Sequence, residues 1–479
     1  MIHPTVAGLS RARQISEQPH VAVQPVTQAE PLPGLKRELG LRDLTLFAIV
    51  CVTSARWIPI AAHAGAGSLS LWLLAVVFFV VPLTIAVAAL VAKYPGAGGL
   101  YLWTRNDFGP WNGFLCFWSY WIGIAFLFPT AALLYTKVGF SLLGNTHAHL
   151  GDNRVLLLVA TIALIWIAMG SNLIGLNVGK WTENLGAVAT WALVVLLVIM
   201  ASLVFVRRGT ATPLRILPSW SWGTVSFWAA IAYATSGMEG PGMMAAEMRD
   251  PERTMRRAGW IASGFAAIFY ISATAALLVV LPPERISELN GFADVGDSAG
   301  QLLTAAWISP LIALLVLAGG LGFVGGLGTA SSRLPFAAGV DGLLPKAFGK
   351  IHPQWGTPYV ATLALAVLAT LLLLFYQLGD SLRAAYDELV SVMVITGFIP
   401  YLYVFGSSWK AGKQLSAMSG YAVTLLALLC SVVPPAEIEN VWLFEGKIAV
   451  GTLAVLVSAW LFYRHYKAAA FTCSRAADA

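Results

Sequence analysis

Apolar stretches of about twenty residues follow one another along this chain, and they limit its possible folds. A bilayer core takes about 20 apolar residues per helix, and the run 70–91 contains no Asp, Glu, Lys or Arg. Twelve such stretches are predicted to span a membrane: 44–66, 70–91, 112–137, 154–172, 182–206, 224–247, 257–281, 307–332, 358–376, 386–407, 416–434 and 447–464. Transmembrane β-strands would instead alternate over about ten residues. The prediction is an all-α polytopic membrane protein with about twelve transmembrane helices.

Composition excludes the soluble alternative. Apolar residues make up 58% of the 479 positions and charged residues only 11%, whereas soluble domains carry about 25% charged residues. A water-soluble globule could not bury so much apolar surface. Four scattered cysteines form no disulfide framework, and residues 1–35 lack the apolar core of a signal peptide. We expect 1–35 and 467–479 to be cytoplasmic tails, the first of them disordered.

The cations predict orientation. Twenty of the 29 Lys and Arg residues fall in segments on one side of the twelve spans, and Arg56 and Lys137 fall inside spans. The other side holds only Arg154, Arg207, Arg208, Arg215, Arg285, Arg383 and Lys447. Because cytoplasmic loops carry the excess of cations, both termini are predicted to be cytoplasmic, in an inner or plasma membrane. The net charge of +6 therefore reflects topology, and no nucleic-acid partner is expected.

Two of the predicted spans are interrupted. The first reads Cys51-Val-Thr-Ser-Ala-Arg56-Trp-Ile-Pro59, and the sixth reads Tyr233-Ala-Thr-Ser-Gly-Met-Glu239-Gly-Pro241-Gly. Proline and glycine weaken helices, and non-helical backbone survives at membrane depth only where protein buries it or where it lines a cavity. The interruptions begin successive five-helix sets, a pattern that points to an inverted-repeat transporter and its central site. The alternative is two ordinary kinks.

Three motifs resemble the amino acid–polyamine–organocation (APC) family of amino acid permeases. They are Tyr94-Pro-Gly-Ala-Gly-Gly-Leu-Tyr-Leu-Trp103, the stretch from Tyr233 through Glu239 to Arg253, and Ser332-Arg333 through Asp341-Gly342 to Pro358. This resemblance implies the fold of the leucine transporter, a five-plus-five inverted repeat with two added helices. It implies repeats at 36–206 and 207–410, followed by helices 11 and 12 at 411–466, and alternating access around a midplane site.

This sequence departs from the family pattern at two positions. The family's first helix usually breaks at Gly-Ser-Gly, where bare backbone receives the substrate carboxylate, whereas this chain has Thr53-Ser54-Ala55. Some proton-coupled members carry a lysine midway along helix 5, and the matching residue here is Thr190. The second departure makes lysine-based proton coupling doubtful and favours exchange of one solute for another.

Arg56 and Trp57 follow the first break. A cation at the bilayer centre is costly, so Arg56 is expected to face a cavity or a partner. Its planar guanidinium could bind a substrate carboxylate or repel cationic substrates. The alternatives are snorkelling toward an interface and an ion pair, for example with Glu239. The Arg-Trp pair resembles glutamate/γ-aminobutyrate exchangers.

At the second break, Glu239 could change protonation during transport, since low dielectric penalises its charged form. Alternatively, it accepts backbone N–H bonds and pins the broken helix. Tyr233 matches a family position that often holds an aromatic gate, with simple packing as the alternative. Ser54, Ser236 and Gly237 are candidate substrate-binding residues because donors exposed at a break need partners.

Other candidates lie on neighbouring helices. Ile124 is expected to line the site from the third span. Lys180 and Glu247 are candidates for an intracellular gate pair, although a solvated helix end is an alternative for Lys180. His147 and His149 have no third ligand nearby, and the formal GxGxxG at 320–325 lies inside an apolar helix. We therefore expect no metal, no cofactor and no nucleotide site.

These features predict a secondary active transporter of amino acids that works by alternating access, as an antiporter or a proton-linked symporter. Its expected partners are an amino acid, the bilayer, and a proton or counter-transported amino acid. An integral-membrane enzyme or a channel-like pore for a small polar solute is the alternative. The spans contain no convergent His/Cys/Asp cluster for enzymatic chemistry.

Overall fold

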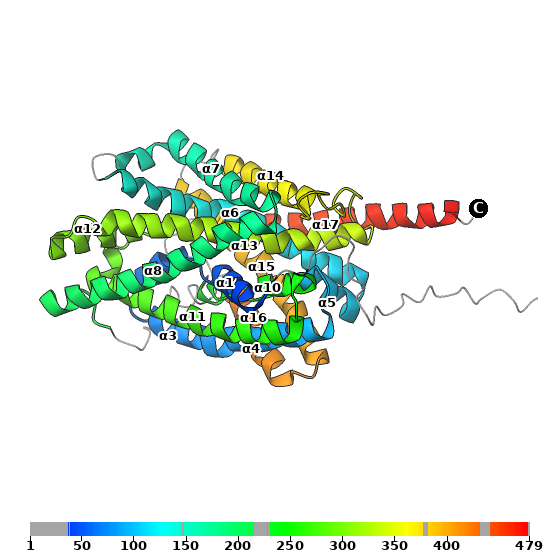
Figure 1. The fold of residues 1–479 in the computed structure, drawn as a ribbon, viewed down its shortest axis with the longest axis horizontal. Coiled ribbons are helices and arrows are strands. Elements are labelled where there is room, and N and C mark those ends of the chain that lie inside the picture. The colour runs from blue at the N-terminus through cyan, green and yellow to red at the C-terminus, as the bar shows by residue number, and fades with distance from the viewer. Residues whose placement is uncertain are drawn as a thin grey trace, which may run out of the picture.

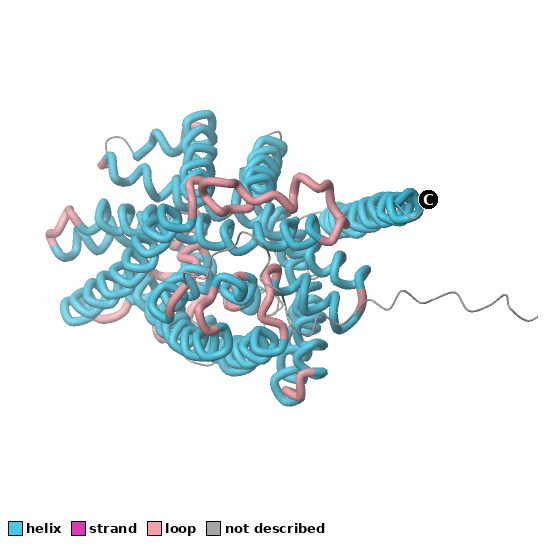
Figure 2. Tube along the Cα trace, turned by 45° about the vertical axis from the view of Figure 1, so that its right-hand side comes forward, coloured by secondary structure: helices cyan, strands magenta, loops and turns pink. Residues whose placement is uncertain are grey.

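The computed structural model describes residues 37, 39–144, 148–214, 228, 230–376, 382–431 and 441–477. These residues are almost entirely helical (Figures 1 and 2), and their one extended pairing is an isolated bridge between Leu39 and Met248. The predicted all-α class is confirmed. The predicted tail at 1–35 lies outside the described residues, and the last helix continues to Ala477, through most of the stretch expected to be a C-terminal tail.

The long helices coincide with the predicted apolar runs, because each run is long enough to satisfy its own backbone hydrogen bonds only as a helix. They are α3 (Ser68–Ala75), η1 (Val76–Val80) and α4 (Val81–Lys93), then α6 (Pro110–Gly139), α7 (Arg154–Leu173), α8 (Leu176–Arg208), α11 (Pro251–Val280), α13 (Ile308–Val340), α14 (Tyr359–Tyr376), α15 (Leu382–Lys410), α16 (Gln414–Ser431) and α17 (Val441–Ala477).

Nine helical stretches in the described part of the chain are long and apolar enough to cross a membrane. A tenth is the bent pair α1 (Leu41–Val52) and α2 (Trp57–His63). The predicted span 358–376 corresponds to α14, a shorter apolar helix. The predicted span 224–247 lies partly outside the described residues and ends in α10 (Glu239–Met243) and η4 (Ala245–Glu247).

Two connecting helices mark the ends of the bundle. α5 (Gly99–Phe108) follows α4 at one end, and α12 (Gly291–Leu303) precedes α13 at the other (Figure 1). We call these the α5 end and the α12 end. Neither helix was predicted as a span. Both are too short to cross a membrane, and α5 includes Arg105 and Asp107.

The helices differ in how much protein surrounds them. The apolar window of α6 and its extension is 89% buried, whereas that of α17 is 22% buried. α6 therefore lies in the interior and α17 at the lipid-facing edge, where it extends beyond the bundle (Figure 1). α8 and α13 approach most closely at two glycines, since a Cβ built on Gly186 would lie 2.5 Å from the Cα of Gly322. Small residues permit such close contact between membrane helices.

Candidate functional site

The first helix break lies at residues 53–56, where the axis turns by 41°. α1 ends as Thr53 leaves helical geometry, and both its amide and its hydroxyl donate to the Ile49 carbonyl, at 3.0 and 2.6 Å. Pro59 is the third residue of α2. It fits there because the first turn of a helix does not need its N–H groups.

The second break lies at residues 235–238, between the helical turn 230–234 and α10. Pro241 is the third residue of α10. In both breaks, therefore, the proline is the third residue of the helix that follows the unwound segment. The sequence predicted both interruptions. The structure shows that the unwound backbone precedes each proline, because proline starts the following helix rather than interrupting it.

The two breaks touch each other at Gly237. Its φ is +113°, and a Cβ built there would lie 2.2 Å from the carbonyl oxygen of Cys51, near the end of α1. Glycine is required because other residues resist this φ and because no side-chain atom fits between the chains. The two interruptions, almost 190 positions apart in sequence, therefore form a single site.

The Tyr270 hydroxyl, from α11, joins both breaks. It accepts a hydrogen bond from the Ser54 amide at 3.1 Å, and it lies within donating distance of the carbonyl oxygens of Ala234 (2.8 Å) and Val52 (3.1 Å). Trp72 stacks on the tyrosine ring at 4.3 Å between centroids. This hydroxyl satisfies backbone groups that the unwound segments release.

Glu239 is buried beside the second break, with 1% of its surface exposed. Tyr120 on α6 and Tyr401 on α15 each donate to its Oε1 at 2.8 Å, and the Gly237 amide donates to Oε2 at 3.1 Å. Its carboxyl group therefore pins the broken helix to two neighbouring helices. No ion pair joins it to Arg56, although the structure describes both residues.

A small cavity lies against the two breaks. Its volume is about 20 Å³, which holds roughly one water molecule and is too small for an amino acid. Residues from six spans line it: Cys51, Ser54, Trp57, Tyr120, Ile124, Leu127, Tyr233, Ala234, Ser236, Gly237, Glu239, Tyr270, Phe323, Leu327 and Tyr401. All of these residues except Ser236 are buried.

Seven of the residues predicted from sequence line this cavity: Ser54, Trp57, Ile124, Tyr233, Ser236, Gly237 and Glu239. Thr53, Ala55 and Arg56 belong to the first break but are not among the lining residues. Arg56 is fully buried, with its guanidinium carbon 4.4 Å from the Trp57 ring centroid and its Nη1 3.9 Å from the Met393 sulfur. Trp57, not Arg56, faces the cavity.

Aromatic rings close the cavity near Trp57. Tyr233 meets Trp57 edge-on at 6.1 Å and Phe398 at 5.5 Å between centroids. Gly397 leaves room for the tyrosine, since a Cβ there would lie 2.4 Å from the Tyr233 ring. Tyr233 therefore occupies a position between α2 and α15 where its movement would open the cavity.

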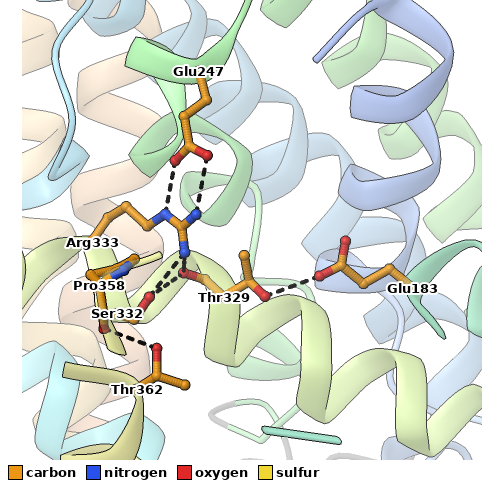
Figure 3. A network of polar contacts seen from close by, with 7 residues as sticks. All are labelled: Glu183, Glu247, Thr329, Ser332, Arg333, Pro358 and Thr362. Atoms are coloured by element: carbon orange, nitrogen blue, oxygen red, sulfur yellow. Dashed lines mark hydrogen bonds and ion pairs between the residues drawn. The ribbon is translucent and has the colours of Figure 1, made fainter. Parts of the chain in front are cut away.

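Buried polar contacts link α13 to α8 and to the exit of the sixth span, toward the α5 end of the bundle (Figure 3). Arg333 on α13 donates through Nε and Nη2 to the two carboxylate oxygens of Glu247, at 2.8 and 3.1 Å. Beside this pair, Leu39 exchanges backbone hydrogen bonds with Glu247 and Arg249. The segment before α1 is thereby attached to the exit of the sixth span.

The sequence suggests that Lys180 and Glu247 form one gate pair, but in the structure each forms an ion pair with a different residue. Lys180 lies 3.3 Å from Asp43 on α1, and Glu247 binds Arg333. Both pairs lie toward the α5 end. Arg333 belongs to the third of the family-like motifs, and no local pattern marks it as the partner of Glu247.

Sequence reasoning also missed the roles of Tyr120, Tyr270 and Tyr401. A tyrosine in an apolar helix carries no local signal of what its hydroxyl reaches. The part of the chain that the structure describes contains no group of three or more His, Cys, Asp or Glu side chains placed to bind an ion. His147 lies outside them.

Several known transporters are similar to this chain. An uncharacterized transporter of Legionella pneumophila is 26% identical over 460 residues, which cover 90% of this chain and 97% of the relative. A cadaverine/lysine antiporter of Escherichia coli is 25% identical over 256 residues, or 51% of this chain and 55% of the antiporter. MhsT, solved in complex with L-phenylalanine, superposes with a TM-score of 0.59 and 16% identity, covering 89% of this chain and 99% of that one.

The likeness to MhsT shows the predicted leucine-transporter fold. A family model described as amino acid permease matches residues 39–442. The chain therefore belongs to the amino acid permease family of the APC superfamily and is a multi-pass membrane protein that transports amino acids by secondary transport.

Proposed function

We propose that this permease moves an amino acid by alternating access, and that the cavity between the two helix breaks is its substrate site in an occluded conformation. The observation that carries this proposal is the contact between the breaks. Gly237 abuts the Cys51 carbonyl, and one hydroxyl of Tyr270 bonds to both unwound segments. A change at either break is thereby transmitted to the other.

In this site the first break, Thr53 to Arg56, receives the substrate carboxylate, and the second break, Ser236 and Gly237, receives the amine. Half-helix N-termini favour anionic groups, and unwound carbonyl oxygens favour cationic ones. Ile124 forms an apolar wall. Since the cavity holds roughly one water molecule, substrate entry requires movement of Trp57, Tyr233 or both.

Gating is assigned to three groups. Trp57 and Tyr233 close one side of the site, and Glu239 with its two tyrosine partners closes the other. Glu247 and Lys180, each in its own ion pair, hold the α5 end shut. The repeats 36–206 and 207–410 rock against each other as these contacts break, while helices at 411–466 stay at the edge.

The α5 end faces the cytoplasm in this proposal, with both termini inside and the protein in the inner or plasma membrane. The support is the excess of cations in the segments that meet at that end, including Lys93, Arg105, Arg249 and Arg333. Labelling of single cysteines placed at position 350 and at position 285 in intact cells would test it. A membrane-impermeant maleimide should reach only position 285, and reaction at position 350 alone would reverse the orientation.

The central test is a counterflow screen in proteoliposomes. Vesicles loaded with unlabelled amino acid are diluted into the same labelled amino acid at two pH values, for each of the twenty amino acids and for cadaverine. We expect saturable, trans-stimulated uptake of at least one amino acid. Glu239→Gln should lower the uptake rate by at least about tenfold, while Glu284→Gln at the α12 end should leave it unchanged. Conductive, non-saturable flux would indicate a pore instead.

The same screen decides the mode of coupling. An exchanger needs a trans substrate and shows little dependence on the pH gradient. A proton-linked symporter accumulates substrate in empty vesicles when an inward proton gradient is imposed. The exchange mode is supported by Thr190, whose hydroxyl only bonds back to the Gly186 carbonyl of its own helix.

A further inference from the structure

Glu183 is a buried acid outside the cavity just described. It lies on α8 near the α5 end, with 7% of its surface exposed, and its Oε1 accepts a hydrogen bond from the Thr329 hydroxyl at 3.0 Å (Figure 3). Gly326 on α13 leaves room for it, since a Cβ there would lie 3.7 Å from Glu183 Cγ and 3.1 Å from Val50. The carboxyl group is therefore located where α1, α8 and α13 meet.

The charged groups around Glu183 are already paired. Arg333 on α13 binds Glu247 of η4 with Nε and Nη2, and its Nη1 donates to the Thr329 carbonyl and the Ser332 hydroxyl. Lys180, one turn away on α8, binds Asp43 of α1. Two cations and two anions therefore form two pairs, which leave Glu183 as an additional acid.

The remaining neighbours carry no positive charge. On α1, the titratable group near Glu183 is the buried thiol of Cys51. On α13, the Thr329 hydroxyl supplies the hydrogen bond and does not titrate, and the charged group is Arg333, which is paired with Glu247. Within the described residues, no Lys, Arg or His nitrogen lies within 4 Å of the Glu183 carboxyl. A carboxylate in such a place is unstable in its charged form and is stabilised by a proton.

We propose that Glu183 is a proton-binding site that sets the α5-end gate: it holds a proton while the gate is closed and releases it when the gate opens. On opening, the carboxyl O–H bond breaks, the proton passes to a water molecule of the cytoplasmic pathway, and the carboxylate keeps the electron pair. High cytoplasmic pH thus favours the open gate. The proposal rests on the alternating-access function, and it names the regulation of that function.

Hydrogen–deuterium exchange of α1 (Leu41–Val52) in the full-length protein tests this without a substrate. Exchange is followed from pH 5.5 to 8.5 in lipid nanodiscs and divided by the intrinsic exchange rate at each pH. We expect α1 protection in the wild type to fall with rising pH, by no more than tenfold per pH unit, the limit for one linked proton. Glu183→Gln, which mimics the protonated acid, should remain protected and show no pH slope.

Two further variants separate the role of the acid from its packing. Glu183→Asp keeps an ionisable group, so its α1 exchange should keep a pH slope. If Glu183→Gln fails to fold, this variant still tests whether the slope depends on an acid at position 183. Glu284→Gln removes a carboxylate at the opposite end and should behave as the wild type does. A wild-type slope that persists in folded Glu183→Gln, or a wild type without any slope, overturns the proposal.

Counterflow measured on the same preparations separates this proposal from the proposed function. If no amino acid shows trans-stimulated uptake while α1 exchange keeps its Glu183-dependent pH slope, the transport proposal fails and the proton site stands. If uptake is saturable but neither uptake nor α1 exchange responds to Glu183→Gln, the transport function stands and the proton site fails.

Discussion

At the scale of single residues, the site depends on hydroxyl groups that reach the helix breaks across large sequence distances. Tyr270 bonds to Ser54, 216 positions away, and Tyr401 bonds to Glu239, 162 positions away. Both bonds satisfy buried polar groups at the breaks, and a buried polar group left without a partner costs about 1–3 kcal/mol. Tyrosine hydroxyls are therefore structural parts of both breaks.

Tyr270→Phe should lower both thermal stability and transport. The substitution keeps the ring that stacks on Trp72 and removes the hydroxyl shared by Val52, Ser54 and Ala234, so a loss of about 1–3 kcal/mol is expected. The measurement is thermal unfolding in detergent together with counterflow rate. Tyr403→Phe is the matched control, because its hydroxyl bonds only to the Asn112 side chain away from the breaks. Equal behaviour of the two variants would contradict this role.

Arg56→Ala should impair recognition of acidic or zwitterionic amino acids. Arg56 does not line the cavity, but it packs on Trp57, which does. A desolvated cation–π contact contributes about 2 kcal/mol, so the KM for uptake should rise roughly tenfold or more. Arg56→Lys keeps the charge without the planar guanidinium and should be intermediate. An unchanged KM in a normally folded Arg56→Ala protein rejects this role.

At the scale of helices, glycines decide how closely elements approach. Both helix breaks were predictable because proline and glycine punctuate otherwise apolar runs. The contact at Gly237 was not, since nothing in the local sequence says which backbone lies 2.2 Å from its absent Cβ. The same applies to Gly186 and Gly322, which are one pair among many glycines in apolar helices.

Gly186→Ala should separate α8 from α13 and weaken the bundle. The new Cβ would lie 2.5 Å from the Cα of Gly322, and a backbone contact of that kind cannot be relieved by a side-chain rotation. Overpacking costs about 1–3 kcal/mol, so the melting temperature should fall. Gly170→Ala on α7, which meets nothing within 4 Å, should be neutral. A neutral Gly186→Ala variant would show that the two helices slide apart without cost.

At the scale of the whole molecule, the proposed mechanism takes this conformation to be closed toward both ends. Trp57, Tyr233 and Phe398 pack together on one side of the cavity, and the Arg333–Glu247 pair lies near the α5 end. An alternating-access carrier must pass through such a state, because simultaneous opening at both ends would make a pore.

Arg333→Ala should open the α5 end. Breaking a buried ion pair costs about 3–5 kcal/mol, so the closed state loses much of its advantage. Cys51, a buried thiol that lines the cavity, should then react with a hydrophilic maleimide at least about tenfold faster, as measured by peptide mass spectrometry. Lys137→Ala breaks the Lys137–Asp152 pair and serves as the control. Equal labelling of both variants would show that the Arg333 pair does not hold the gate.

Sequence alone determined the membrane class, the twelve apolar runs, the two interruptions and seven of the fifteen residues that line the cavity. These features are recorded in local composition, because a helix in lipid must satisfy its own backbone and a break must be marked by residues that tolerate it. The tertiary structure decided the partners: Tyr120 and Tyr401 for Glu239, Arg333 for Glu247, Trp57 for Arg56, and Thr329 for Glu183. Those contacts depend on helix rotation and crossing, which a linear pattern does not specify.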